Sequence, residues 1–549
     1  MLAGVLLLTL LVYLRCLANG FVSDDHAMIV ENKYIAQWSY LWKSLTKELW
    51  WFFKSNRASP TSLYQPIQNI WLWLAFHLFG TNPVGWHLAK IALHLCVVLL
   101  VFRLAQLLSK STSVALLAAL LFGLLPVHVE PIVFATDIPE PLSTAFDLGA
   151  MCIFIRRARD RYWSGILAPL LLYAGAAFTH ESAVVFPVLI AAYVFLFETD
   201  DGTSSASGTP MGSAPIGSRL GEAVKWSAPF FCIALLYLGA RALVLGTRGI
   251  LGFTAKRFTA TLDKGKLVIQ SVPIHSSVAE ILATLPSVLL WYLGLLLLPW
   301  LAGPAHEAYF VNRPTFINFY APCAILLLLA SGGYLLFRSS PRARLYLFCA
   351  IWWLVGTAPA PLPAIRLGVD VELICDRFQY LPSFAFCLLL ADMAVQCGRN
   401  SAALRRAITV TVTALAVVYA VALWRAEAVW YDDVTMFSRC VQNTPDLAHY
   451  HEVLGYRLVQ QGDLKSGERE LVRASTLEPI NYKIHFKLAL LYVGIKRDQD
   501  AHKELEAFFR TAFARKAPTP QTIASPQIAV IAPEASVAPT TASQPKQPK

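Results

Sequence analysis

Apolar stretches close to twenty residues long recur along this chain, and they constrain its fold more than any other feature. A helix of about 20 residues crosses the hydrocarbon core of a bilayer with every backbone hydrogen bond satisfied internally. With 56% hydrophobic and 15% charged residues, the composition is also far more apolar than that of soluble domains. Strand-like alternation does not recur, so helices rather than a barrel are expected. The chain is therefore predicted to be an all-α, polytopic membrane helix bundle.

About twelve crossings are predicted. Residues 86 to 102 and 138 to 155 are included although they carry His87, Lys90 and Asp147. The uncharged stretches are residues 1 to 14, 111 to 127, 162 to 179, 182 to 197, 226 to 240, 281 to 301, 316 to 337, 345 to 365, 378 to 391 and 407 to 424. Residues 1 to 18 are expected to be a retained membrane helix, because no basic segment and no small-residue cleavage site accompany them.

The formal net charge of +11 comes from short basic loops at alternate helix ends, which argues against a nucleic-acid partner. Such loops set membrane topology and lie on the cytoplasmic side. They contain Arg103 with Lys110, residues 156 to 161, residues 338 to 344 and residues 398 to 406. The intervening loops are then outside the cytoplasm. This alternation fails at one place, so residues 281 to 301 are either re-entrant or preceded by a hidden crossing within 247 to 280.

Three regions are expected along the chain. Residues 1–428 form the membrane domain, whose first outer loop spans 20–85 and carries an amphipathic interfacial helix over 40–55. Residues 198–218 read as a flexible linker, rich in Gly, Ser and Pro. Residues 429–515 form a helical repeat segment outside the cytoplasm, and residues 516–549, rich in Pro, Ala, Thr and Gln, form a disordered tail.

The repeat segment shows a spacing of 34 residues between Pro445 and Pro479, which is the spacing of tetratricopeptide repeats. His451 and His485 are also 34 residues apart. Within the first repeat, Gly455 permits close helix contact, Gly462 and Asp463 make the turn, Ala474 is a small packing residue, and Pro479 ends the second helix.

Four motifs place ionisable side chains at predicted outer helix ends, and these ends should converge on one face. Each motif alone has an ordinary explanation, such as a solvated loop, a packing histidine or an interfacial anchor. Ionisable groups at membrane depth are, however, costly and mark functional sites. The motifs supply Asp24 and Asp25; His128 and Glu130; His180 and Glu181; and Glu372, Asp376 and Arg377.

One carboxylate base beside fixed cations suits substitution at a carbon whose leaving group is already an anion. A sugar attached to a lipid phosphate is such a substrate. The leaving phosphate needs no general acid, so inverting transfer needs only a base that deprotonates the acceptor hydroxyl. Either Asp24 or Asp25 fits the base, and Arg377 fits the phosphate ligand.

The same residues carry a family resemblance. The pattern F-x-x-DD-x-x-x-I-x-x-N from Phe21 to Asn32, YQPI from Tyr64 to Ile67, LFGTNPVGWHLAKIALHL, PVHVEPI, THESAVVFP and DRFQYLPS stand in order along the chain. Together they resemble the transmembrane and tetratricopeptide repeat-containing O-mannosyltransferases and their bacterial relatives, which are GT-C glycosyltransferases. The chain differs from its relatives at Gln65, His180 and Phe378, where they often carry arginine, lysine and tyrosine.

The resemblance implies a polyprenyl-phosphate sugar donor, with mannose as the candidate sugar, and a protein or glycan acceptor reached through the repeats. It implies Asp24 as the base and Asp25 as its supporting partner. The implied donor or substrate ligands are Arg377, His180, Glu181, His128, Glu130, Tyr64 and Gln65. A divalent cation such as Mg²⁺ or Mn²⁺ on Asp24, Asp25 and Glu130 is a possible cofactor, although an acidic pair does not establish one.

Two other functions compete with a transferase. A transporter or flippase of a lipid-linked sugar would place its ionisable groups near the bilayer midplane and show repeat symmetry, and neither feature is found. A non-catalytic scaffold that displays its repeats would hardly need so many membrane helices. The short chain and few repeats favour a bacterial inner membrane over an endoplasmic reticulum.

Overall fold

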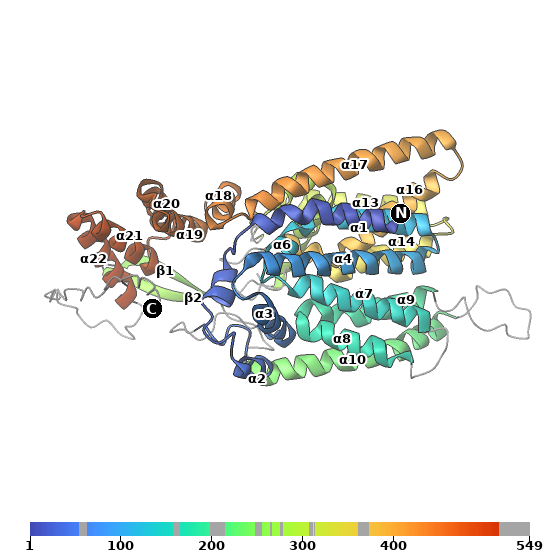
Figure 1. Ribbon diagram of the computed structural model, residues 1–549, viewed down its shortest axis with the longest axis horizontal. Helices are drawn as coiled ribbons and strands as arrows, with labels where there is room; N and C mark the ends of the chain where they lie inside the picture. Colours follow the sequence, from blue (N-terminus) through green and yellow to red (C-terminus); the bar gives the residue numbers. More distant parts are fainter. Residues whose placement is uncertain are drawn as a thin grey trace, which may run out of the picture.

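The computed structural model of the protein describes residues 1–53, 63–157, 165–197, 215–246, 255–263, 266–274, 278–306, 311, 313–360 and 373–514. Its main body is a bundle of apolar helices that run along the long dimension of the molecule (Figure 1). The bundle contains α1 (Leu2–Tyr13), α4 (Pro83–Ser109), α5 (Thr112–Leu124), α7 (Pro139–Arg157), α8 (Leu167–Thr179), α9 (Phe186–Phe197), α10 (Ile216–Leu245), α13 (Ala321–Phe337), α14 (Ala343–Thr357), α16 (Ser383–Cys397) and α17 (Ala402–Val429). This bundle confirms the predicted helical membrane architecture.

Five described helices are long and apolar enough to cross a bilayer, namely α4, α10, α12 (Val278–Leu297), α17 and the segment Phe316–Phe337 that contains α13. A sixth candidate is the pair Thr112–Leu124 and Pro126–Val133, which is bent by 55°. Shorter apolar helices of 10–17 residues complete the bundle. The chain is therefore a multi-pass membrane protein, and the count of about twelve crossings stays a prediction.

Local sequence fixes the ends of these helices. The Asn82 side chain caps α4 by accepting a hydrogen bond from the Val84 N–H at 3.1 Å, and Pro83 occupies the first turn. In the same way, Ser401 caps α17 through the Leu404 N–H at 3.2 Å. A small residue sets one close contact inside the bundle, since a Cβ on Gly123 of α5 would lie 2.5 Å from Thr9 Oγ1 of α1. Glycine is therefore required where these two helices meet.

The two ends of the bundle differ. The end on the left of Figure 1, called the outer end here, carries the first loop and the C-terminal helices. Its short elements are η1 (Leu14–Ala18), η2 (His26–Val30), α2 (Trp38–Thr46), α3 (Pro66–Phe79), η3 (Pro126–His128), α6 (Val129–Val133), η6 (Glu181–Val185), η8 (Pro299–Leu301), η9 (Phe316–Tyr320) and η10 (Asp376–Gln379). The opposite end, called the basic end, carries the arginine- and lysine-rich turns that are predicted to be cytoplasmic.

The helix predicted over residues 40–55 is shorter than expected. It is α2, which ends at Thr46 because Lys47 takes an extended conformation. The chain then turns, and the Leu49 N–H donates to the Leu63 carbonyl at 2.9 Å, so residues 47–53 are held by backbone pairing rather than by helix. Trp38 and Trp42 are 75% and 70% exposed, which leaves an aromatic face on α2 that suits a membrane interface.

Residues 255–274 depart from the purely helical prediction. Residues 255–263 and 266–274 form two antiparallel strands, β1 (Ala255–Asp263) and β2 (Lys266–Ile274), in which Ala255 pairs with Ile274 and Asp263 with Lys266. Helix α12 follows these strands, and β2 lies against the last C-terminal helix. Just after α12, the Gly303 N–H donates to Asp376 Oδ2 at 2.7 Å. Helix α12 is itself long and apolar enough to cross a bilayer, so the expectation that residues 281 to 301 are not a simple crossing stays a prediction.

The C-terminal helices are a first helix followed by two pairs. The first helix is α18 (Asp433–Asn443), and the pairs are α19 (Ala448–Gln460) with α20 (Leu464–Leu477) and α21 (Tyr482–Gly494) with α22 (Asp498–Ala514). Gly455 meets α20 so closely that a Cβ would lie 2.8 Å from Leu471, Gly462 turns the chain at φ 90°, and Ala474 is fully buried. These three roles agree with the sequence. The linker residues 198–214 and the tail 516–549 lie outside the described residues.

One contact recurs with the period of the sequence. His451 Nδ1 lies 2.7 Å from Glu470 and its Nε2 lies 3.0 Å from the Pro445 carbonyl. The equivalent ring of His485 lies 2.7 Å from Glu504 and 2.9 Å from the Pro479 carbonyl. The two helix pairs thus share a local geometry, while their assignment as tetratricopeptide repeats stays a prediction.

Candidate functional site

The two aspartates of the first loop point in different directions because of the local backbone conformation. Ser23 has a positive φ of 49°, which is uncommon for a residue with a side chain. The Asp25 side chain is fully buried, and its oxygens accept hydrogen bonds from the Thr136 N–H at 2.8 Å and the Val22 N–H at 3.2 Å. Asp24 is exposed. Asp25 therefore anchors the loop, and Asp24 is the carboxylate that a ligand can reach.

Asp24 is reached by water but is surrounded by protein. Desolvation by the surrounding protein raises the pKa of Asp24 above the ordinary 3.8. The nearby charges of Arg377 and His449 act in the opposite direction and lower the pKa. From its exposure together with partial desolvation we infer that this carboxylate lies in a recess of the outer end. Burial raises the pKa of Asp25 further, to about 7. The two neighbours therefore differ in access, in partners and in proton affinity.

Arg377 and Glu130 form an ion pair that joins η10 to α6. The Arg377 guanidinium binds Glu130 Oε1, and the Arg377 backbone N–H donates to Glu130 Oε2 at 3.0 Å. The Glu130 side chain is 6% exposed and that of Arg377 is 31% exposed. The Arg377 side chain is therefore partly accessible, and its charge acts on Asp24. Asp376, which precedes Arg377, is buried, and its Oδ1 lies 2.7 Å from His306 Nε2. This contact holds η10 against the segment after α12.

A second polar group lies where α3 meets η6. Gln65 Nε2 donates to Glu181 Oε2 at 2.7 Å, and His180 Nδ1 lies 2.5 Å from Ser182 Oγ and 3.5 Å from Glu140 Oε1. Glu140 is buried and stands in the electrostatic range of both His180 and Arg377. It therefore connects this group to the group around Asp24.

Two predicted ligands lie elsewhere. His128 is fully buried, and its ring nitrogens lie 2.9 Å from the Phe122 carbonyl and 2.9 Å from Ser383 Oγ. Tyr64 is 4% exposed, donates its hydroxyl to the Leu45 carbonyl at 2.8 Å and stacks on Tyr237. With their polar atoms engaged inside the protein, both residues hold the outer end together rather than face the recess.

Several charged residues of this region were not expected from the sequence. Asp137 lies near Asp24, and the charges of Asp25 and Asp137 also lie near the buried Lys90, whose Nζ donates to the Asp137 carbonyl at 2.5 Å. His449 comes from α19, and the only hint in the sequence was the predicted outer position of that segment. The C-terminal helices thus contribute directly to the surroundings of Asp24.

Asp433 connects those helices to the acidic loop. Its Oδ1 accepts from the Ser23 N–H at 2.8 Å, and its Oδ2 lies 3.0 Å from His26 Nε2 and 2.8 Å from Arg457 Nε. These partners lower the pKa of Asp433 despite its partial burial. The carboxylate is therefore ionised at neutral pH, and it holds the unusual Ser23 conformation in place.

The three carboxylates considered for a cation do not form a metal site. Asp25 is bonded to two backbone amides, and Glu130 is bonded to Arg377. Among the residues that the structure describes, no group of three His, Cys, Asp or Glu side chains has an arrangement that could hold a metal ion. The residues of this site instead offer one accessible carboxylate, one partly accessible guanidinium and a set of supporting acids.

Comparisons with known proteins agree with the resemblance drawn from the motifs. Residues 65–209 match the model of the family described as dolichyl-phosphate-mannose-protein mannosyltransferase. Protein O-mannosyl-transferase TMTC3 from Mus musculus is 23% identical over 505 residues, which are 89% of this chain and 52% of the mouse protein. The human TMTC3 is 22% identical over 89% of this chain and 53% of its own length.

Other matches are shorter or looser. A protein O-mannosyl-transferase from Caenorhabditis elegans is 30% identical over 152 residues, or 27% of this chain and 22% of the worm protein. The solved oligosaccharyltransferase of Archaeoglobus fulgidus covers 82% of this chain at 14% identity, with 58% of its own length and a TM-score of 0.37. The chain spans about half the length of the mouse and human relatives. By sequence, the chain is thus similar to protein O-mannosyltransferases across its membrane domain and its C-terminal helices.

Proposed function

We propose that this protein is a membrane glycosyltransferase that moves a sugar from a polyprenyl-phosphate donor to a hydroxyl group of a protein or glycan. Mannose is the candidate sugar because the relatives are named O-mannosyl-transferases. The transfer takes place at the outer end of the bundle, outside the cytoplasm, in a bacterial inner membrane or, in a eukaryote, in the endoplasmic reticulum. The accessible Asp24 carboxylate, held in a recess beside Arg377, is the observation that carries this proposal.

Asp24 is the base in this mechanism. The acceptor oxygen attacks the anomeric carbon, its proton passes to the Asp24 carboxylate, and the bond from that carbon to the phosphate oxygen breaks. The phosphate leaves as an anion, so no acid is needed to protonate it, and the configuration at the anomeric carbon inverts. Partial desolvation raises the proton affinity of Asp24, which makes it a stronger base than a carboxylate in water.

Arg377 binds the donor phosphate in this mechanism. Glu130 holds its guanidinium in position, and the Arg377 side chain is 31% exposed, so a phosphate can approach it from solvent. Charge on the phosphate grows as the bond to the sugar breaks, so a fixed cation stabilises the transition state more than the ground state. Gln65, Glu181 and His180 lie farther along the same end and suit contacts to the sugar hydroxyls.

The acidic pair offers a direct test. Purified protein in detergent or liposomes would be assayed for transfer from a polyprenyl-phosphate mannose donor to a peptide acceptor, with Asp24→Asn, Asp25→Asn and Glu31→Gln compared. Glu31 is an exposed acid of the same loop and serves as the matched control. Loss of a general base predicts a fall of about 10²- to 10⁴-fold for Asp24→Asn, and little change for Glu31→Gln. Undiminished transfer by Asp24→Asn would refute the assignment of the base.

A further inference from the structure

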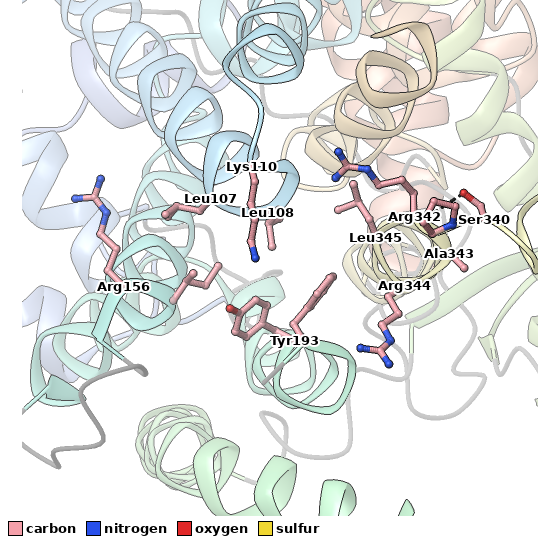
Figure 2. A pocket seen from close by; sticks show the side chains of 13 residues that line it. Leu107, Leu108, Lys110, Arg156, Tyr193, Ser340, Arg342, Ala343, Arg344 and Leu345 are labelled. Carbon is pink, nitrogen blue, oxygen red and sulfur yellow. Dashed lines mark hydrogen bonds between the residues drawn. The ribbon is translucent and has the colours of Figure 1, made fainter. Parts of the chain in front are cut away.

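A pocket of about 670 Å³ opens at the basic end of the bundle, far along the helices from Asp24. The C-terminal ends of α4, α7 and α9 line it together with the turn before α14 (Figure 2). The lining residues are Leu107, Leu108, Lys110, Ile155, Arg156, Tyr193, Phe197, Ser340, Pro341, Arg342, Ala343, Arg344 and Leu345. Four of these are cations, and among the described lining residues there is no carboxylate.

The cations come from three separate segments and surround the pocket. Figure 2 shows Lys110 in the middle, with Arg156 on one side and Arg342 and Arg344 on the other. Arg342 is fixed, because its NH1 donates to the Ser109 carbonyl at 2.9 Å and its NH2 lies 3.9 Å from the buried Asp392. Among the described residues, Asp392 lies behind this wall, and the wall itself carries four cations and no carboxylate. Such an excess of positive charge around a concave surface favours an anion.

Lys110 has an unusual backbone for its position. It ends α4 in the left-handed region with φ 55°, a conformation in which glycine is the least strained residue. The turn sends the lysine side chain into the pocket rather than along the helix (Figure 2). The chain thus has a strained lysine where glycine would cap the helix at lower cost, which is consistent with a use for the ammonium group.

The rest of the lining is apolar. Leu107, Leu108, Ile155, Phe197 and Leu345 bring hydrocarbon next to the cations. Basic residues that serve only as topology signals need neither a shared pocket nor an apolar wall. An ion free in solution would gain nothing from that wall, whereas a molecule with a phosphate at one end and a hydrocarbon stem at the other would use both parts. The position at the ends of membrane helices places the pocket at headgroup depth.

We propose that this pocket binds the phosphate headgroup of an anionic membrane lipid, on the opposite side of the membrane from Asp24. Lys110 contacts the phosphate, Arg156 and Arg344 add positive charge on either side of it, and the leucine and phenylalanine side chains contact the first carbons of the lipid chains. The bound lipid would tie the turn before α14 to the ends of α4 and α9. This proposal does not depend on the proposed transferase activity, because the two sites lie at different ends of the bundle.

The test uses one substitution that removes the charge without straining the fold. Lys110→Gly deletes the ammonium group and relieves the left-handed backbone. Lys496→Gly is the matched control, since Lys496 also has a positive φ, of 59°, but lies between α21 and α22. Both variants lose the same charge and the same type of strain. Binding of phosphatidylglycerol to the full-length protein in detergent would be followed by native mass spectrometry and by thermal stabilisation, with phosphatidylcholine for comparison.

We expect phosphatidylglycerol to bind the original chain and the Lys496→Gly variant equally, and to bind the Lys110→Gly variant about fivefold more weakly. Equal binding by all three chains would overturn the proposal, as would equal binding of phosphatidylcholine. Glycerol phosphate and inorganic phosphate form separate arms of the test. If either one stabilised the protein as well as the lipid at equal concentration, the pocket would be a site for a soluble phosphate, and the lipid assignment would be wrong.

Discussion

Asp24 and Asp25 are adjacent in the chain, yet they cannot be exchanged. The positive φ of Ser23 and the hydrogen bond from its N–H to Asp433 turn one carboxylate into the recess and the other into the protein. Sequence predicts that an acidic pair is present but not which member is accessible, because that choice depends on a single backbone angle set by a residue about four hundred positions away. The inequality of the pair is therefore a property of the fold.

A pH profile can test the surroundings of Asp24. A base must be ionised, so activity is lost as the pH falls through its pKa. The charge of His449 lowers that pKa, and His449→Gln should therefore move the acidic limb of the profile to higher pH while leaving the maximal rate largely unchanged. His502→Gln, at an exposed histidine of α22, serves as the control. A limb that stays in place or moves to lower pH in His449→Gln would show that the histidine does not act on the base.

Asp25 should affect stability rather than transfer. Its pKa is about 7 in the folded protein and close to 3.8 when unfolded, so the folded form keeps a proton that the unfolded form releases between these values. The free energy of unfolding should consequently fall as the pH rises from about 4 to about 7 and then level off. Asp25→Asn has no proton to lose. The difference in melting temperature between the original chain and Asp25→Asn should shrink across that window, and a constant difference would contradict the prediction.

At the scale of elements, Asp433 of α18 connects the C-terminal helices to the acidic loop. Asp433→Ala removes the acceptor of the Ser23 N–H and the partner of His26 and Arg457, so we expect a loss of about 1–3 kcal/mol in stability and a clear fall in transfer. The neighbouring Asp432→Ala is the matched control, because Asp432 caps α18 by accepting from the N–H and the hydroxyl of Thr435, at 2.8 and 2.7 Å. Thermal unfolding and transfer would be measured for both variants. Equal transfer by both would show that the Asp433 contacts do not position the loop.

The sequence predicted some elements well for a physical reason. Alternating membrane helices must bring every second loop to the same end, so Glu130, Glu181 and Arg377 could be placed near Asp24 by topology alone. Side-chain direction inside a short turn follows no such rule, and His128 points into the protein as a result. Strands β1 and β2 were missed because a single pair of nine-residue strands does not give a recurring alternation along the chain. His449 and Asp433 were missed because the packing of α18 and α19 against the first outer loop leaves no periodic pattern in the sequence.

At the scale of the whole molecule, we expect the C-terminal helices to have two separable roles. The segment from Tyr431 through α18 and α19 holds the loop, because the Tyr431 carbonyl accepts from the Gly20 N–H at 2.9 Å, Asp433 accepts from the Ser23 N–H, and His449 lies near Asp24. The pair α21 and α22 packs against α20 and contributes none of these three contacts. The first role concerns the geometry of the site, whereas the second pair is free to serve acceptor recognition.

Three truncations separate these roles. A chain of residues 1–514 should transfer sugar as the full chain does. A chain of residues 1–480 keeps the contacts of Tyr431, Asp433 and His449, so it should transfer sugar to a short peptide at a similar rate but lose a preference for a protein acceptor. A chain of residues 1–431 loses Asp433 and His449, so the loop is released and transfer to either acceptor should fall as far as in Asp24→Asn, by about 10²-fold or more. Assays with peptide and protein acceptors on matched amounts of folded protein would measure these rates. If residues 1–431 were as active as the full chain, the membrane domain alone would complete the site, because the C-terminal contacts to the loop would then have no effect on Asp24.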